Sequence, residues 1–193
     1  LSAAGAGAGK EARAKKVAIT GFQARDVIMS SQQKHFVISR VLAAPRDLVW
    51  KVFTQEKHLL NWWGPKDFKV NYCKLDLRPG GLFHYCLAMP NGDEMWGKWV
   101  FRAIAAPERL VFLSSFSDAK AGTARHAMKM VWPLEILATI SFAEEGDKTR
   151  VTVDWIPENA SLEENAAFDE FHQSMRGGWT GTFEQLEDYL AKI

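Results

Sequence analysis

The stretch ISRVLAAPRDLVWKVFTQEKHLLNWWGP, residues 38–65, contains the first signals that decide the fold. The run 35–42 has apolar side chains on both of its faces, which is typical of a well-covered strand. Ala44-Pro45 predicts the start of a helix, because the N–H that proline lacks would have no partner in a first turn. Thr54 is a candidate N-cap for a second short helix, which ends at Gly64-Pro65. The stretch therefore predicts one strand followed by two short helices.

Downstream of this stretch, apolar and polar residues alternate with the period of two that is typical of strands. Asn91-Gly92 predicts a tight hairpin, because both residues readily adopt the positive φ angles that such turns need. The segment 117–127 is polar and predicts a loop. The alternation predicts a run of about six antiparallel strands, over residues 68–77, 82–88, 94–104, 109–116, 134–143 and 148–156.

A long helix is predicted from Ser161 to about Leu190. Ser161 can cap it, and two glutamates occupy the first turn, where the helix dipole favours negative charge. Gly177-Gly178 would let this helix bend, or let the sheet approach it closely. Its apolar side chains recur at three- and four-residue spacing, so it must lie on something large, and the sheet is the only large partner. These residues are Phe168, Phe171, His172, Met175, Trp179, Phe183, Leu186 and Leu190.

Several short motifs occur in a characteristic order between residues 31 and 192. They are Arg40, Ala44-Pro45, Trp62-Trp63-Gly64-Pro65, the turns at 78–81 and 107–110, and His172, Met175 and Gly178-Trp179. In this order they resemble the SRPBCC (START-like) superfamily. More narrowly, the chain is similar to its AHSA-like family, the homologues of the activator of the heat-shock chaperone's ATPase.

The resemblance implies an α+β helix-grip fold. In that fold a curved antiparallel sheet of about six to seven strands surrounds a long C-terminal helix, two short helices follow the first strand, and an apolar cavity lies between sheet and helix. Relatives include lipid carriers, hormone receptors, polyketide cyclases and chaperone regulators, so the fold alone implies little about chemistry.

Aromatic residues are numerous, with 8 Trp and 12 Phe, and they either fill a thick core or line a wide pocket. Phe83 and Tyr85 share one face of a strand, whereas Trp96 and Trp99 lie on opposite faces of the next. Plain core packing is the competing interpretation for each of them. The candidates for the cavity wall are Trp62, Trp63, Phe83, Tyr85, Trp99, Phe171, His172, Met175 and Trp179.

The candidate acid or base is His172 or Tyr85, and His172 would act as a base if a carboxylate such as Asp154 or Glu94 lies beside it. A lone histidine on an apolar stripe is more often a packed core group. Arg40 and Arg78 are expected to form ion pairs, although a guanidinium can also anchor a ligand carboxylate. The sequence has no GxSxG, HExxH or phosphate-loop motif and no metal-ligand spacing of its histidines, so neither a cofactor nor a metal is expected.

The charge of the chain is balanced, with 24 basic and 23 acidic residues, which argues against nucleic-acid binding through phosphate contacts. The sequence has no run of apolar residues long enough to span a membrane. Cys73 and Cys86 are expected to be reduced thiols of a cytoplasmic protein. Residues 1–16 are expected to be a flexible tail or an expression-vector remnant, residues 17–193 a single domain, and 26–30 a short leading strand.

Three functions remain open at this point. The leading hypothesis is a binding module that holds a small hydrophobic molecule in the cavity. The alternatives are a cyclase- or hydrolase-like enzyme acting on an aromatic or polyketide-type substrate, and a regulator of a chaperone ATPase acting through protein contacts. A homodimer is allowed by the sequence but not required by it.

Overall fold

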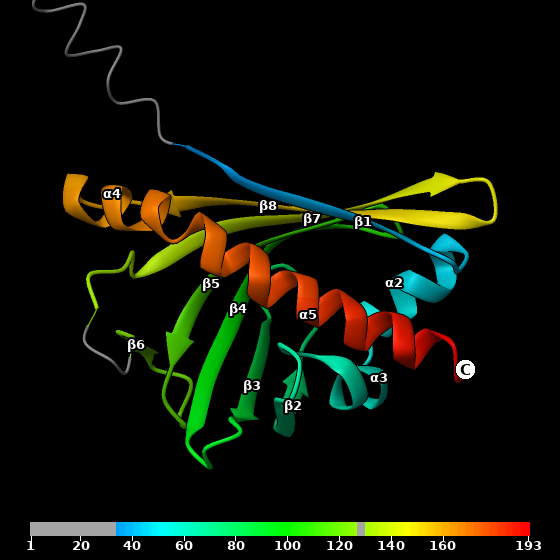
Figure 1. The fold of residues 1–193 in the computed structure, drawn as a ribbon, viewed down its shortest axis with the longest axis horizontal. Coiled ribbons are helices and arrows are strands. Elements are labelled where there is room, and N and C mark those ends of the chain that lie inside the picture. Colours follow the sequence, from blue (N-terminus) through cyan, green and yellow to red (C-terminus); the bar gives the residue numbers. More distant parts are fainter. Residues whose placement is uncertain (1–33, 127–129) are drawn as a thin grey trace, which may run out of the picture. The chain divides into compact units, whose positions relative to one another are not determined.

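The computed structural model describes residues 34–126 and 130–193, which belong to one compact unit (Figure 1). The predicted tail, the start of the domain at residue 17 and the leading strand at 26–30 lie outside the described residues. The strands are β1 (Phe36–Leu42), β2 (Lys69–Leu75), β3 (Leu82–Ala88), β4 (Glu94–Ala105), β5 (Arg109–Ser117), β6 (Thr123–Ala124), β7 (Glu135–Glu145) and β8 (Lys148–Glu158). The helices are α2 (Arg46–Thr54), α3 (Glu56–Trp62), α4 (Leu162–Glu170) and α5 (His172–Leu190).

The strands form one antiparallel sheet in the order β1-β8-β7-β5-β4-β3-β2, and β6 pairs with β5. Figure 1 shows the sheet curling so that α5 runs diagonally along its open side, with α2 and α3 near the C-terminal end of α5. The prediction of an α+β helix-grip fold is therefore confirmed. Among the described residues, no helix is long and apolar enough to cross a membrane.

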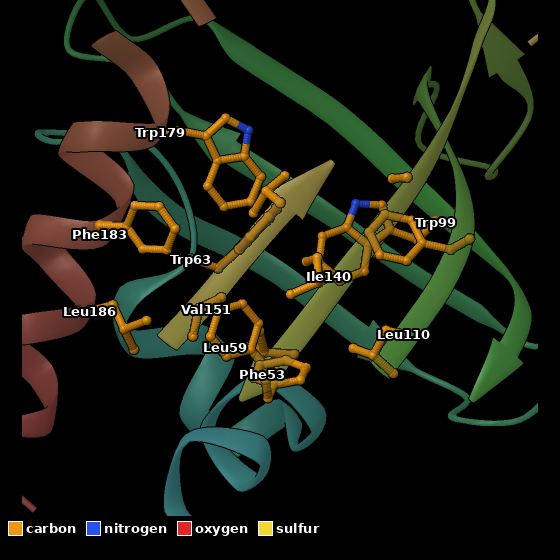
Figure 2. Packing of buried hydrophobic residues seen from close by; sticks show 14 of the residues in the cluster. Phe53, Leu59, Trp63, Trp99, Leu110, Ile140, Val151, Trp179, Phe183 and Leu186 are labelled. Carbon is orange, nitrogen blue, oxygen red and sulfur yellow. The ribbon is translucent and has the colours of Figure 1, made fainter. Parts of the chain in front are cut away.

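The core lies between the concave face of the sheet and α5. Figure 2 shows Trp179, Phe183 and Leu186 pointing from α5 toward the strands. All three side chains are buried, with exposed fractions of 5% or less. The apolar stripe predicted for the long helix therefore packs where amphipathic spacing places it, against the large apolar face of the sheet.

The start of the long helix follows the prediction. The Ser161 hydroxyl accepts a hydrogen bond from the Glu164 backbone N–H at 3.1 Å, and the Ser161 N–H donates to the Glu164 carboxylate at 2.9 Å. This reciprocal pair is a capping box, which satisfies two backbone donors that the first turn would otherwise leave free.

The prediction of one continuous helix was wrong. The helix breaks at Phe171, whose φ and ψ of −84° and 0° separate α4 from α5. The rings of Phe168 and Phe171 both pack on Trp132, from the loop that precedes β7, so the break accompanies the packing of that loop on the helix. Gly177 and Gly178 do not cause the break, and no atom lies within 4 Å of a Cβ placed on either.

Two local expectations also need correction. Thr54 does not cap α3, because its hydroxyl donates back to the Trp50 carbonyl at 2.6 Å and Gln55 occupies the cap position. The close approach expected at the glycine pair occurs at Gly181 instead, where an added Cβ would lie 3.0 Å from the Lys66 backbone nitrogen. The α5 helix therefore packs tightly near its middle against the loop that follows α3.

Candidate functional site

A cavity of about 330 Å³ lies between the concave face of the sheet and the first half of α5. The strands β3, β4 and β5 supply one wall, and the face of α5 formed by Met175, Gly178, Trp179 and Thr182 supplies the opposite wall. These positions are separated by three, four and seven residues, so they share one side of the helix. The loop after α3, the segment before β7 and single residues of β7 and β8 add to the lining.

Six of the nine residues predicted for the cavity wall line this cavity. They come from the loop after α3, from two neighbouring strands and from the beginning of α5, and they are Trp63, Tyr85, Trp99, Phe171, Met175 and Trp179. Tyr85 and Trp99 face the same side of the sheet because the registers Tyr85↔Gly97 and Phe83↔Trp99 put them on the same face of paired strands.

The other three predicted residues are not part of the lining. Trp62 lies in the core, where its indole N–H donates to the Val52 carbonyl at 3.1 Å. Phe83 is fully buried beneath the rings of Trp63 and Trp99. His172 is not among the lining residues, although it lies three and seven residues before Met175 and Trp179 on α5.

His172 packs edge-on against the rings of Phe36 and Phe168. Its Nε2 is buried without a hydrogen-bond partner, and the nearest carboxylate, that of Asp169, lies 3.9 Å away. The partners proposed from the sequence are elsewhere, since Asp154 binds His35 at 2.8 Å and Glu94 accepts from the Trp96 indole. The predicted acid–base pair therefore does not form.

The two arginines of the sequence motifs form ion pairs instead of facing the cavity. Arg40 on β1 makes a bidentate contact with Glu187 on α5, at 2.8 and 2.7 Å. Arg78 pairs with Asp76 in the turn before β3. The Arg40 pair connects β1 with α5, whereas the exposed Arg78 pair lies within one turn.

Sequence reasoning missed several residues of the wall. Trp155 lines the cavity from β8, and the alternation of Val151, Val153 and Trp155 would have indicated that they share a face. Trp132 lines it from the segment before β7, which has no periodic pattern to reveal it. Met95, Phe116 and Met130 add further apolar surface.

Tyr85 is the phenol of the lining, and most of its surface is buried. Its ring lies directly over Gly97 on the neighbouring strand, where an added Cβ would be 2.4 Å from the phenolic oxygen. Burial raises the pKa of the Tyr85 hydroxyl, and the nearby Trp63 indole N–H offsets part of this shift, although it is not aligned for a hydrogen bond. Tyr85 is therefore a neutral phenol at physiological pH.

His126 is the second titratable residue of the lining. Its ring packs edge-on against Phe116, with 4.6 Å between the ring centroids. Burial lowers the pKa of His126, so its imidazole is favoured in the neutral form. The remaining polar lining consists of the hydroxyls of Ser114, Ser115, Ser174 and Thr182, and Thr182 donates to the Gly178 carbonyl at 2.9 Å.

Metal binding finds no support in the side chains. Within residues 34–126 and 130–193, no group of three or more His, Cys, Asp or Glu residues could hold a metal ion. Cys73 and Cys86 are free thiols on neighbouring strands, and burial raises the pKa of Cys73 to about 12 and of Cys86 to about 11. Both are therefore protonated and poorly nucleophilic at neutral pH.

The comparison with known families decides the identity of the fold. The sequence profile described as "Activator of Hsp90 ATPase homolog 1-like protein" matches residues 43–191. The chain belongs to this AHSA1-like family. The AHSA1-like match begins just after β1 and spans the remaining strands and all four helices. A search of curated proteins found no match to this chain.

Solved structures of similar proteins share the AHSA1-like fold. The protein Ms6760 from Mycobacterium smegmatis is 24% identical with a TM-score of 0.67, and the match covers 82% of this chain and 91% of that one. Protein NE0264 from Nitrosomonas europaea is 25% identical with a TM-score of 0.65, covering 83% and 96%. The AHSA1 protein of Silicibacter pomeroyi is 18% identical with a TM-score of 0.62, covering 82% and 98%.

Proposed function

We propose that this protein binds a small hydrophobic molecule in the cavity between the sheet and α5. The observation that carries the proposal is the cavity itself, which has about 330 Å³ of space and walls made mainly of indole, phenyl and thioether groups. Ligand sites in proteins have this character, with a few polar groups that fix the orientation of the ligand. The SRPBCC resemblance supports the proposal, since that superfamily includes carriers and receptors of apolar molecules.

The energetics allow a useful affinity. Each buried CH₂ group contributes about 0.8 kcal/mol, so a ligand that buries about ten carbons gains about 8 kcal/mol before the costs of association. With no association cost this gain would correspond to a dissociation constant of about 1 μM, so we expect a micromolar or weaker affinity once those costs are included. Aromatic ligands would gain further from edge-to-face contacts with the tryptophans of the wall.

Gly178 offers a direct test of where the ligand binds. It lies on the cavity face of α5, and no atom is within 4 Å of a Cβ placed there, so Gly178→Leu should fill the cavity without a clash. Replacing a helical glycine also stabilises the helix by about 1 kcal/mol, so we expect this variant to fold and to melt no lower than the native chain. Ligand binding measured by thermal shift and calorimetry should be lost.

Gly177→Leu is the matched control. Gly177 is exposed, has the same open surroundings and is not part of the lining, so the same substitution gains the same helix propensity without entering the cavity. It should bind ligands as the native chain does. If both variants bind equally well, or if neither they nor the native chain binds any apolar compound, the cavity is not the binding site and the proposal fails.

The enzyme alternative has less support. A cyclase or hydrolase acting on an aromatic or polyketide-type substrate needs an acid and a base, and the described lining includes Tyr85 and His126 but no aspartate or glutamate. Turnover of a bound ligand, abolished in Tyr85→Phe while binding persists, would restore this alternative.

Partner and location remain predictions. A chaperone contact is suggested only by the description of the family, and enrichment of the chaperone with this chain over a control protein would support it. The free thiols of Cys73 and Cys86 agree with the expected cytoplasmic location. A homodimer is tested by measuring the mass of the particle in solution.

A further inference from the structure

We infer that the cavity selects electrically neutral ligands, with at most a hydroxyl or carbonyl group, and rejects anionic amphiphiles such as carboxylates and sulfonates of the same shape. The inference rests on the proposed function, because it names the ligand class of the same site. It follows from the positions of the charged side chains, which lie outside the described lining of the cavity.

The wall itself has no formal charge. Among the lining residues that the structure describes there is no aspartate, glutamate, lysine or arginine. The polar lining consists of one phenol, one imidazole and four hydroxyls, and the phenol and the imidazole are both favoured in their neutral forms. An ionised ligand group placed there would lose its water without gaining an opposite charge.

Among the described residues, a cation that contacts the lining is already paired. Arg125 follows β6, and its guanidinium donates to the carbonyl of the lining residue Trp132 at 3.3 Å and to the Glu164 carboxylate at 2.8 Å. A ligand carboxylate at this guanidinium would share its charge with Glu164, which the capping box also holds in place, so Arg125 offers it little uncompensated charge. Lys34, Arg40 and Lys66 pair in the same way, with Asp169, Glu187 and Glu184. Arg176 on α5 is not part of the lining; it donates to the Val37 carbonyl and lies over the Phe36 ring.

The helix dipole does not replace the missing cation. The N-terminus of α5 lies beside the cavity at Phe171, and an isolated helix start would attract an anion. Here α4 ends where α5 begins, and the Phe171 N–H is bonded to the Ala167 carbonyl at 3.1 Å. The negative end of one dipole therefore lies against the positive end of the other, and much of the attraction is cancelled.

The hydroxyls can recognise a neutral polar group instead. Ser114 lies opposite Trp99 on the neighbouring strand and lines the cavity, as does the buried Tyr85. A hydroxyl can both donate and accept a hydrogen bond, so this pair can satisfy an alcohol, a phenol or a carbonyl equally well. Aromatic walls with a few hydroxyls therefore fit a neutral aromatic compound that has one oxygen function.

Two fluorescent probes with the same ring systems test the inference. N-phenyl-1-naphthylamine is neutral, and 8-anilino-1-naphthalenesulfonate differs from it by one sulfonate group. We expect the native chain and Gly177→Leu to bind the neutral probe, with the sulfonate bound at least about 100-fold more weakly because its charge is desolvated without a partner. Dodecanol and dodecanoate, measured by displacement of the neutral probe, should show the same preference on an aliphatic scaffold.

A charge-gain variant completes the test. Ser174 lines the cavity from an exposed position on α5, so Ser174→Lys should improve binding of the sulfonate at least about tenfold relative to Ser174→Gln, while the neutral probe changes little. Sulfonate binding to the native chain within tenfold of the neutral probe, and lost in Gly178→Leu, would overturn the charge selectivity but leave the proposed function standing. Failure of the neutral compounds to distinguish Gly178→Leu from Gly177→Leu would overturn both.

Discussion

At the scale of the residue, the polar character of the cavity depends on the position of the Tyr85 ring. Tyr85 can lie flat against the sheet only because its partner on β4 is a glycine. A side chain at position 97 would occupy the space that the phenol ring takes. The pair therefore keeps the centre of the cavity open and directs the hydroxyl along the wall.

Gly97→Ala should push the Tyr85 ring into the cavity. The added Cβ would lie 2.4 Å from both Cζ and the phenolic oxygen, closer than any van der Waals contact. We expect a loss of about 1–3 kcal/mol in the free energy of unfolding, measured by denaturant titration, and weaker binding of the neutral probe.

The double variant Tyr85→Ala with Gly97→Ala serves as the control. Removing the ring removes the clash, so the second substitution should cost much less in the Tyr85→Ala background than alone. Additive losses in the two variants would show that the ring and the glycine are not coupled.

At the scale of the element, the sequence predicted what depends on short-range chemistry. The Ser161 cap, the hairpin at Asn91-Gly92 and the strands follow from neighbouring residues, and the structure has them within a few positions. The break at Phe171 could not be predicted, because it accompanies packing on Trp132, nearly forty residues away along the chain. The pairing of β6 with β5 is likewise a tertiary event within a segment that is locally polar.

The N-terminus of α4 gives a pH-dependent prediction. The hydrogen bond from Arg125, together with that from the Ser161 N–H, holds the pKa of Glu164 below its ordinary value. Because the unfolded-state pKa is higher, at about 4.3, the ionised carboxylate stabilises the fold above that pH. This contribution is lost as the pH falls through the folded-state pKa.

We therefore expect Glu164→Gln to lower the free energy of unfolding by about 0.5–1 kcal/mol at pH 7, since Arg125 is largely exposed and the ion pair is screened. The difference from the native chain should shrink toward zero near pH 3. Glutamine keeps an acceptor for the cap, so Glu164→Ala should lose more. Glu163→Gln removes the same charge from the same turn, and we expect it to lower the free energy of unfolding less than Glu164→Gln does. If the two losses were equal, the contribution of Glu164 would come from the helix dipole alone.

At the scale of the whole molecule, the architecture was predicted from the order of motifs, but the limits of the cavity were not. The alternation of side chains along a strand indicates which residues share a face of the sheet, which is why Tyr85 and Trp99 were candidates. The sequence could not separate core residues from wall residues. Phe83 and Tyr85 lie on the same face of β3 and both contact Trp63, yet only Phe83 is fully buried. His172 has the same helical spacing as Met175 and Trp179, but it lies against Phe36 and Phe168 where α4 meets α5, outside the lining.

Trp63 connects the parts of the molecule that surround the cavity. Its ring contacts those of Trp62, Phe83, Tyr85, Trp99 and Trp179, which come from α3, two strands and α5. Trp63→Ala should therefore lower the free energy of unfolding by about 3–5 kcal/mol in urea titration. Trp96→Ala, on the opposite face of the sheet and partly exposed, should cost clearly less, and a similar cost would mean that Trp63 is not central to packing.

The indole groups around the cavity also have an optical consequence. Trp63 lies 4.8 Å from Trp99 and 5.9 Å from Trp179, measured between ring centroids, and Trp179 lies 5.6 Å from Trp155. Excitation absorbed by any of these four rings can pass to the others by resonance transfer, because the separations are far shorter than the range of that process. The four rings therefore share their excitation energy, and a bound molecule that quenches one of them would reduce the fluorescence of all four.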